Sequence, residues 1–154
     1  MIKKIISGGQ TGADQAALDA AIKAKIPHGG WIPQGRLTES GRLPVRYHLQ
    51  EMPTTSYSAR TEQNVIDSDG TLIISNGPLS GGSEYTREMA LKHRKTILHI
   101  NLSQTMEPDA VESIRVWITK HKILTLNVAG PRASQDPLIY ENVLSLILKI
   151  LSAE

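Results

Sequence analysis

The strongest constraint on the fold is an apolar run at residues 2–6 that stops at a glycine-rich turn and leads at once into a helical pattern. The turn covers residues 7–12 and contains three glycines. A strand, a glycine turn and a helix in this order are typical of α/β proteins that bind anions, because a helix N-terminus has unpaired N–H groups and roughly half a positive charge. Small residues recur at helical spacing after the turn, which predicts a helix lying close against a sheet: Ala13, Ala16, Ala17, Ala20, Ala21 and Ala24.

Apolar runs and amphipathic stretches alternate along the rest of the chain. Strands separated by helices predict a mainly parallel sheet with helices on both faces, which is a doubly wound, Rossmann-like α/β fold. Residues 27–57 are irregular and rich in proline, with short strands expected near 30–32 and 47–50. The other predicted strands are residues 71–75, 96–101 and 123–128, and the other predicted helices are 58–68, 83–94, 108–121 and a final apolar helix opened by Pro137.

Length and composition predict one domain over residues 1–154 with a core that needs no disulfide. The chain has no cysteine, so thiolate metal sites and cysteine nucleophiles are excluded. No signal segment and no apolar run of about 20 residues is visible, which favours a cytoplasmic protein without a membrane partner. The net charge of +2 is too mild to predict a nucleic-acid partner. The five histidines are scattered, and we therefore expect no metal site.

Polar, glycine-rich loops follow three of the predicted strands. In a parallel sheet these loops lie at the carboxyl edge, where ligands bind. Two of these loops lead into helices, whose positive N-terminal ends would face the same cleft and favour an anion. The alternative is that each loop is an ordinary βα turn. The first loop also lacks the Lys-Ser/Thr pair of a P-loop and the glycine spacing of a dinucleotide site. The candidate ligand-binding residues are Gly8, Gly9, Gln10, Thr11, Gly12 and Asp14 in the first loop, Ser80, Gly81, Gly82 and Ser83 in the second, and Gly130 and Arg132 in the third.

Further candidates lie outside these loops. Arg60, Asn64 and Asp67 share one side of a predicted helix, where arginine suits a phosphate and asparagine a sugar or pterin edge. The alternative for them is a solvated helix face. Arg36, together with Arg42 and Arg46, is expected either to close over an anion as a flexible flap or to belong to an ordinary basic loop.

Several motifs together resemble the molybdenum cofactor carrier family. They are Gly-Gly-Gln-Thr-Gly-Ala-Asp at residues 8–14, Gly-Gly-Trp at 29–31 with Pro-Gln-Gly-Arg at 33–36, Arg-Thr-Glu-Gln-Asn at 60–64, Ser-Gly-Gly-Ser at 80–83 and Asn-Val-Ala-Gly-Pro-Arg at 127–132. The resemblance covers nearly the whole chain and implies a Rossmann-like fold, with the molybdenum cofactor (molybdopterin) as bound cargo. The wider superfamily includes cytokinin-activating phosphoribohydrolases. Their signature resembles residues 80–88, where Glu88 matches the catalytic glutamate but Ser80, Glu84 and Tyr85 depart from the pattern.

These observations favour a carrier that binds a phosphorylated pterin or nucleotide-like ligand without chemistry on it. Two alternatives remain open: an N-glycosidase acting on nucleoside monophosphates through Glu88, and a sensor of nucleotide derivatives. The apolar last helix also predicts a homodimer or a higher homo-oligomer.

Overall fold

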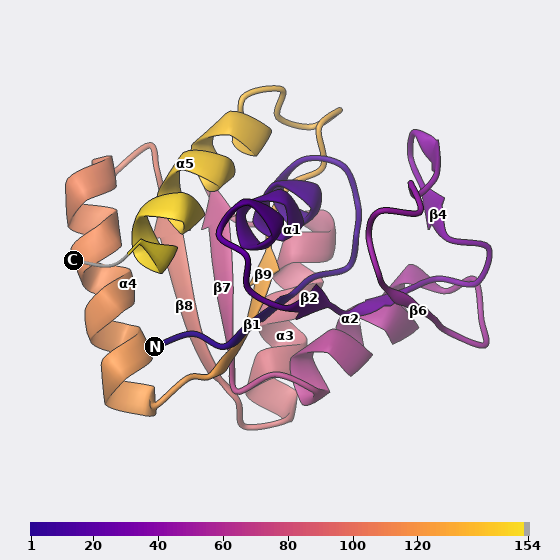
Figure 1. Ribbon diagram of the computed structural model, residues 1–154, viewed down its shortest axis with the longest axis horizontal. Helices are drawn as coiled ribbons and strands as arrows, with labels where there is room; N and C mark the ends of the chain where they lie inside the picture. The colour runs from indigo at the N-terminus through magenta and orange to yellow at the C-terminus, as the bar shows by residue number, and fades with distance from the viewer. Residues whose placement is uncertain (153–154) are drawn as a thin grey trace.

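The computed structural model describes residues 1–152 and has a five-stranded parallel sheet at its centre. The strand order is β2-β1-β9-β7-β8 (Figure 1). This architecture confirms the predicted Rossmann-like α/β fold. The strands are β1 (Lys4–Ile6), β2 (His28–Gly29), β7 (Gly70–Ser75), β8 (Thr96–Asn101) and β9 (Thr125–Ala129).

Helices cover both faces of the sheet. On one face α1 (Ala13–Lys23) packs against α5 (Ile139–Leu151), which also contacts α4 (Glu107–His121). On the other face α2 (Tyr57–Ile66) packs against α3 (Gly81–Lys92). Apart from β2, which was not predicted, these helices and strands lie within about two residues of their predicted bounds, because their apolar periodicity is strong.

The strand order is that of a Rossmann fold with a shifted starting point. Numbered along the chain, the five strands lie in the order 2-1-5-3-4. Moving β9 and α5 in front of β1 changes this order to 3-2-1-4-5, which matches the first five strands of the Rossmann order 3-2-1-4-5-6. The loop after β9 therefore occupies the place of the first Rossmann βα turn, next to the point where the strand order reverses.

Residues 27–57 form a separate small arrangement beside the sheet. It contains β3 (Trp31–Ile32), paired with β6 (Gln50–Glu51), and the hairpin of β4 (Leu37–Thr38) and β5 (Gly41–Arg42). The hairpin was not expected from the sequence, and the strand predicted at 47–50 lies slightly later in the chain. A small apolar cluster supports the segment: Leu18, Ile32, Leu43, Tyr47 and Leu49.

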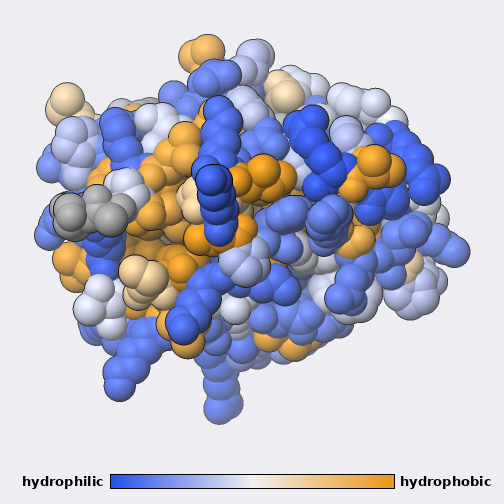
Figure 2. Space-filling view, in the orientation of Figure 1, coloured by the Kyte–Doolittle hydropathy of each residue, from blue (hydrophilic) through white to orange (hydrophobic). Residues whose placement is uncertain are grey.

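The apolar last helix is largely used inside the fold. Its buried face belongs to the main core, and further leucines of α5 pack partly buried against the same core. Figure 2 shows apolar residues gathered on the side of this face where α4 and α5 lie, while the side of residues 27–57 is mostly hydrophilic. The predicted homo-oligomer stays a prediction. Within the described residues, no helix combines the length and apolarity needed to cross a membrane.

Candidate functional site

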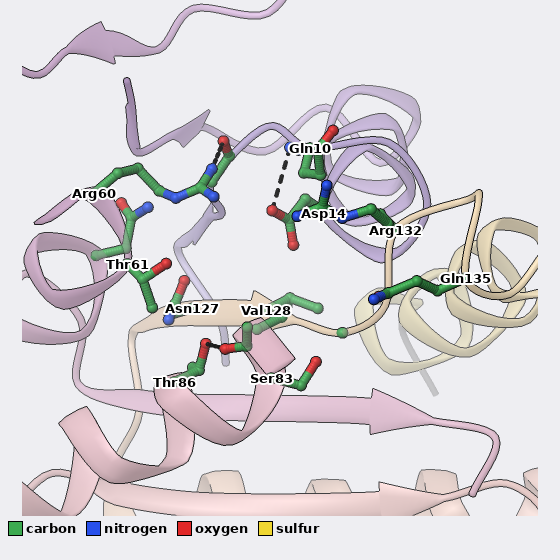
Figure 3. Close-up of a pocket in the computed structure, with 15 residues that line it drawn as sticks. Gln10, Asp14, Arg60, Thr61, Ser83, Thr86, Asn127, Val128, Arg132 and Gln135 are labelled. Atoms are coloured by element: carbon green, nitrogen blue, oxygen red, sulfur yellow. Dashed lines mark hydrogen bonds between the residues drawn. The ribbon is translucent and has the colours of Figure 1, made fainter. Parts of the chain in front are cut away.

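A polar cleft opens at the carboxyl ends of β1 and β9, between α2 and the N-terminus of α3 (Figure 3). It encloses about 600 Å³, counting space open to solvent. The structure brings together parts of all three predicted loops here. The lining residues are Gly8, Gln10 and Asp14 from the first loop and α1, Arg60, Thr61 and Asn64 from α2, Gly82, Ser83 and Thr86 from α3, and Asn127, Val128, Ala129, Gly130, Arg132 and Gln135 from β9 and its loop.

Arg60 reaches the cleft from α2 and is buried, with 7% of its surface exposed. Its Nη1 donates a hydrogen bond to the carbonyl of Gly8. A side chain at Gly8 would force Arg60 to shift, because an added Cβ would lie against the guanidinium group. Burial lowers the pKa of Arg60, and the nearby Asp14 carboxylate opposes that shift. The glycine therefore makes room for a buried positive charge beside β1.

Arg132 enters from the opposite side, on the loop after β9 (Figure 3). Tyr57, the first residue of α2, lies near both arginines: its ring centroid is 5.3 Å from Cζ of Arg60 and 5.8 Å from Cζ of Arg132. The face of an aromatic ring attracts cations at such distances. Tyr57 thus helps to hold two guanidinium groups at one cleft against their mutual repulsion.

Asp14 supplies a negative charge between these two arginines (Figure 3). Its side chain is buried on the first turn of α1, and its Oδ2 accepts a hydrogen bond of 3.2 Å from the backbone N–H of Gln10. Burial raises the pKa of Asp14 to about 6, although Arg60, Arg132 and backbone hydrogen bonds act in the other direction. The carboxyl group can therefore change its charge close to neutral pH.

The N-terminus of α3 faces the cleft with Gly82 and Ser83. No side chain caps this helix end, whereas the N-cap Ser56 of α2 accepts a hydrogen bond from the N–H of Ala59. The end of α1 is used differently: the N–H of Ala13 donates to the carbonyl of Pro131. The α3 end faces the cleft without a side-chain cap, the N–H of Ser83 donates to the carbonyl of Ser80, and the positive end of the helix favours an anion there.

Three candidates of the first loop serve the fold around the cleft. Gly9 lies against the apolar side chains of the 27–57 segment, and Gly12 lies against the backbone of the loop after β9. Thr11 donates to Glu39 of the small hairpin and accepts from the N–H of Ala133. The first loop therefore connects the hairpin with the loop after β9. Of its candidate residues, Gly8, Gln10 and Asp14 line the cleft.

The second loop contributes only part of its candidates. Ser80 and Gly81 precede the cleft-lining part of α3, and Ser80 lines a neighbouring hollow. Glu88 is exposed on α3 and does not belong to the lining residues. The structure therefore does not bring the candidate catalytic glutamate into the cleft.

Arg36 and Asn64 have their polar groups committed to the protein itself. The guanidinium of Arg36 donates to the carbonyls of four residues within its own segment: Leu43, Pro44, Tyr47 and Leu49. Asn64 lines the cleft, yet its amide accepts from the N–H of Trp31 and donates to the carbonyl of the same residue. Arg36 is thus a structural brace and not part of a flap, and Asn64 fixes β3 against α2.

Several lining residues were not predicted as ligand-binding: Thr61, Thr86, Asn127 and Gln135. Asn127 had a recognisable signal, because it is a polar residue inside an apolar strand, and its amide donates to the hydroxyl of Thr71. Tyr57 had no signal, since its role depends on two arginines that are distant in sequence.

A second hollow adjoins the cleft, and Ser83 and Gln135 line both. Its walls come from the loop after β7 and the loop before α5: Ser75, Asn76, Pro78, Leu79, Ser80, Pro131 and Asp136 complete the lining. Among residues 1–152, no group of three or more His, Asp or Glu side chains lies close enough to hold a metal ion.

Fold and cleft together define a Rossmann-like protein with a polar, net-positive cleft at the switch point of its sheet. The chain belongs to the circularly permutated YpsA SLOG family, whose model matches residues 5–151. That description agrees with the shifted strand order. The chain is also similar to a Putative molybdenum carrier protein from Syntrophus aciditrophicus SB, known from a crystal structure, with 57% identity, a TM-score of 0.97, and coverage of 98% of this chain and 96% of that one. No curated protein matches the sequence.

Proposed function

We propose that the protein binds a small phosphorylated ligand in the cleft and acts as a carrier for a molybdenum-containing pterin. The observation that supports it is the meeting of Arg60, Arg132 and the uncapped N-terminus of α3 in one cleft. Guanidinium groups and helix N–H groups are the donors that phosphate prefers. The name of the similar Syntrophus protein supports the choice of cargo.

The chain's own residues fit such a cargo. The cleft would hold the phosphate, and the adjoining hollow would take the rest of the ligand past Ser83 and Gln135. A molybdenum pterin holds its metal through its own dithiolene sulfurs, so a chain without cysteine can still carry it. Of the described residues that line the cleft, Asp14 is the one carboxylate and Glu88 is not among them, which favours binding over an N-glycosidase that acts through Glu88.

Native mass spectrometry of the purified protein tests this proposal. We expect an additional mass that matches a phosphorylated pterin and that disappears in Arg132→Ala. The matched control is Arg115→Ala, a change on α4, which does not line the cleft. An equal additional mass in all three proteins would contradict the assigned site. Calorimetry with molybdopterin, guanosine monophosphate and ribose 5-phosphate then ranks the ligands, and an absence of saturable binding for all three would contradict the proposed function.

A further inference from the structure

With Asp14 ionised, the net charge of the cleft does not balance a doubly charged anion. Arg60 and Arg132 supply two positive charges, and Asp14 removes one of them when it is ionised. A phosphate ester dianion placed between the arginines would also lie beside the Asp14 carboxylate. Two negative charges at such close range repel each other, so a bound dianion raises the pKa of Asp14 and favours its protonated form. The cleft therefore matches a dianion only when Asp14 is neutral.

Asp14 is placed so that it can take up a proton without disturbing the fold. Its side chain is 8% exposed and is surrounded by cleft residues, and its carboxyl group accepts hydrogen bonds from the backbone N–H groups of Gln10, at Oδ2, and of Gly8. The charged groups that face it are Arg60 from α2 and Arg132 from the loop after β9. No histidine or second carboxylate belongs to the described lining of the cleft. A proton taken up on ligand binding would therefore go to Asp14.

Gln10 provides an independent sign that a group is missing from this corner of the cleft. It is 6% exposed, and its Oε1 accepts from the N–H groups of Thr11 and Glu39. Its Nε2, in contrast, is a buried side-chain donor without a partner among the described residues. Buried donors are normally satisfied, so an orphaned one that lines a cleft favours an acceptor on the ligand. An oxyanion oxygen is such an acceptor.

We propose that the cleft binds an oxyanion together with one proton, which is held on Asp14 and shared with the oxyanion. Neutral Asp14 and the Gln10 amide then donate to the bound group from one side, while the two arginines contact it from the others. The raised pKa of Asp14 in the free protein supports this, since little further stabilisation is needed to protonate it. This inference rests on the proposed function, because it requires an anion in the same cleft.

Sulfate is a suitable probe, because it does not titrate between about pH 5 and 8, so proton uptake can come only from the protein. At constant ionic strength, we expect the sulfate affinity to rise roughly tenfold or more from pH 8 to pH 5.5. Asp14→Asn, which keeps a neutral side chain of the same shape, should bind with nearly the same affinity at both ends of this range. Glu112→Gln, a change of an exposed carboxylate on α4, should keep the wild-type dependence.

The wild-type protein gives a second measurement that needs no variant. The carboxyl carbon of Asp14, followed by NMR, should titrate with a pKa at least one unit higher with sulfate than without it. An unchanged pKa, or an affinity that falls on acidification, would overturn the inference while leaving anion binding intact. If neither the wild type nor Asp14→Asn binds sulfate or a phosphate ester at any pH, the proposed function itself is wrong.

Discussion

Two regions of this protein bring arginines close to glycine-containing loops, yet they use them in opposite ways. In the 27–57 segment, the guanidinium of Arg36 donates to four backbone carbonyls. In the cleft, Arg60 donates to a single carbonyl and Arg132 lies over the ring of Tyr57. The comparison teaches that an arginine is a ligand candidate only where its donors are not already used by the fold.

Arg36→Met should give the largest effect, and the effect should be on stability. The change leaves four carbonyls without their shared donor, and we expect a loss of about 3 to 4 kcal/mol in the free energy of unfolding. Chemical denaturation measures this loss. Arg42→Met, an exposed change on β5, is the matched control and should cost less than about 0.5 kcal/mol. If Arg36→Met instead lowers ligand affinity at unchanged stability, the contrast between the two regions fails.

Arg132→Ala should show the opposite pattern. Removal of a charge-assisted contact should weaken the binding of a phosphate-bearing ligand by about 1.5 to 3 kcal/mol, with the fold intact. Calorimetry gives the affinity, and thermal unfolding of the same sample gives the stability. Unchanged affinity at unchanged stability would remove Arg132 from the site and leave Arg60 and the α3 end to hold the anion.

Asp14→Asn should stabilise the free protein near neutral pH. The folded state holds the Asp14 proton more tightly than the unfolded chain, since the pKa rises from 3.8 to about 6. The ionised carboxylate therefore costs stability above about pH 6, and this cost disappears as the pH falls toward 4. We expect a gain of about 1 to 2 kcal/mol at pH 7.5 and nearly none at pH 4, measured by urea unfolding. A gain that is the same at both pH values would contradict the burial argument.

Glu88→Gln should give the smallest effect. Glu88 is exposed and lies outside the cleft, so its loss should change both stability and phosphate-ester affinity by less than about 0.5 kcal/mol. Incubation with nucleoside monophosphates, followed by chromatography of the free base, tests the N-glycosidase alternative. Release of base by the wild type that stops in Glu88→Gln would restore that alternative against the carrier.

Much of the fold could be predicted because its signals are local. The apolar face of α4 and the buried run of β7 depend on residues close together in the chain, and both elements were predicted to within about two residues. The β4–β5 hairpin was missed, since its two-residue strands have no periodicity and both residues of β5 are exposed. The brace formed by Arg36 depends on carbonyls of a turn that local patterns did not reveal.

The candidate site could be predicted only in part. Glycine loops at strand ends correctly indicated the edge of the sheet where the cleft opens, because parallel strands place their carboxyl ends together. Gly9 and Gly12 nevertheless turned out to allow close packing. A glycine needed for a close approach has the same sequence pattern whether a ligand or another loop approaches it.

The sequence by itself determined the order of strands and helices, the absence of cysteine chemistry and the three loops at the carboxyl edge. These properties follow from periodicity and composition, which are local or additive. Only the tertiary structure decided that β9 lies between β1 and β7, that Arg60 and Arg132 share one aromatic ring, and that Asp14 is buried between them. The physical reason is that burial, hydrogen-bond satisfaction and pKa depend on which distant segments meet, and no local pattern encodes that meeting.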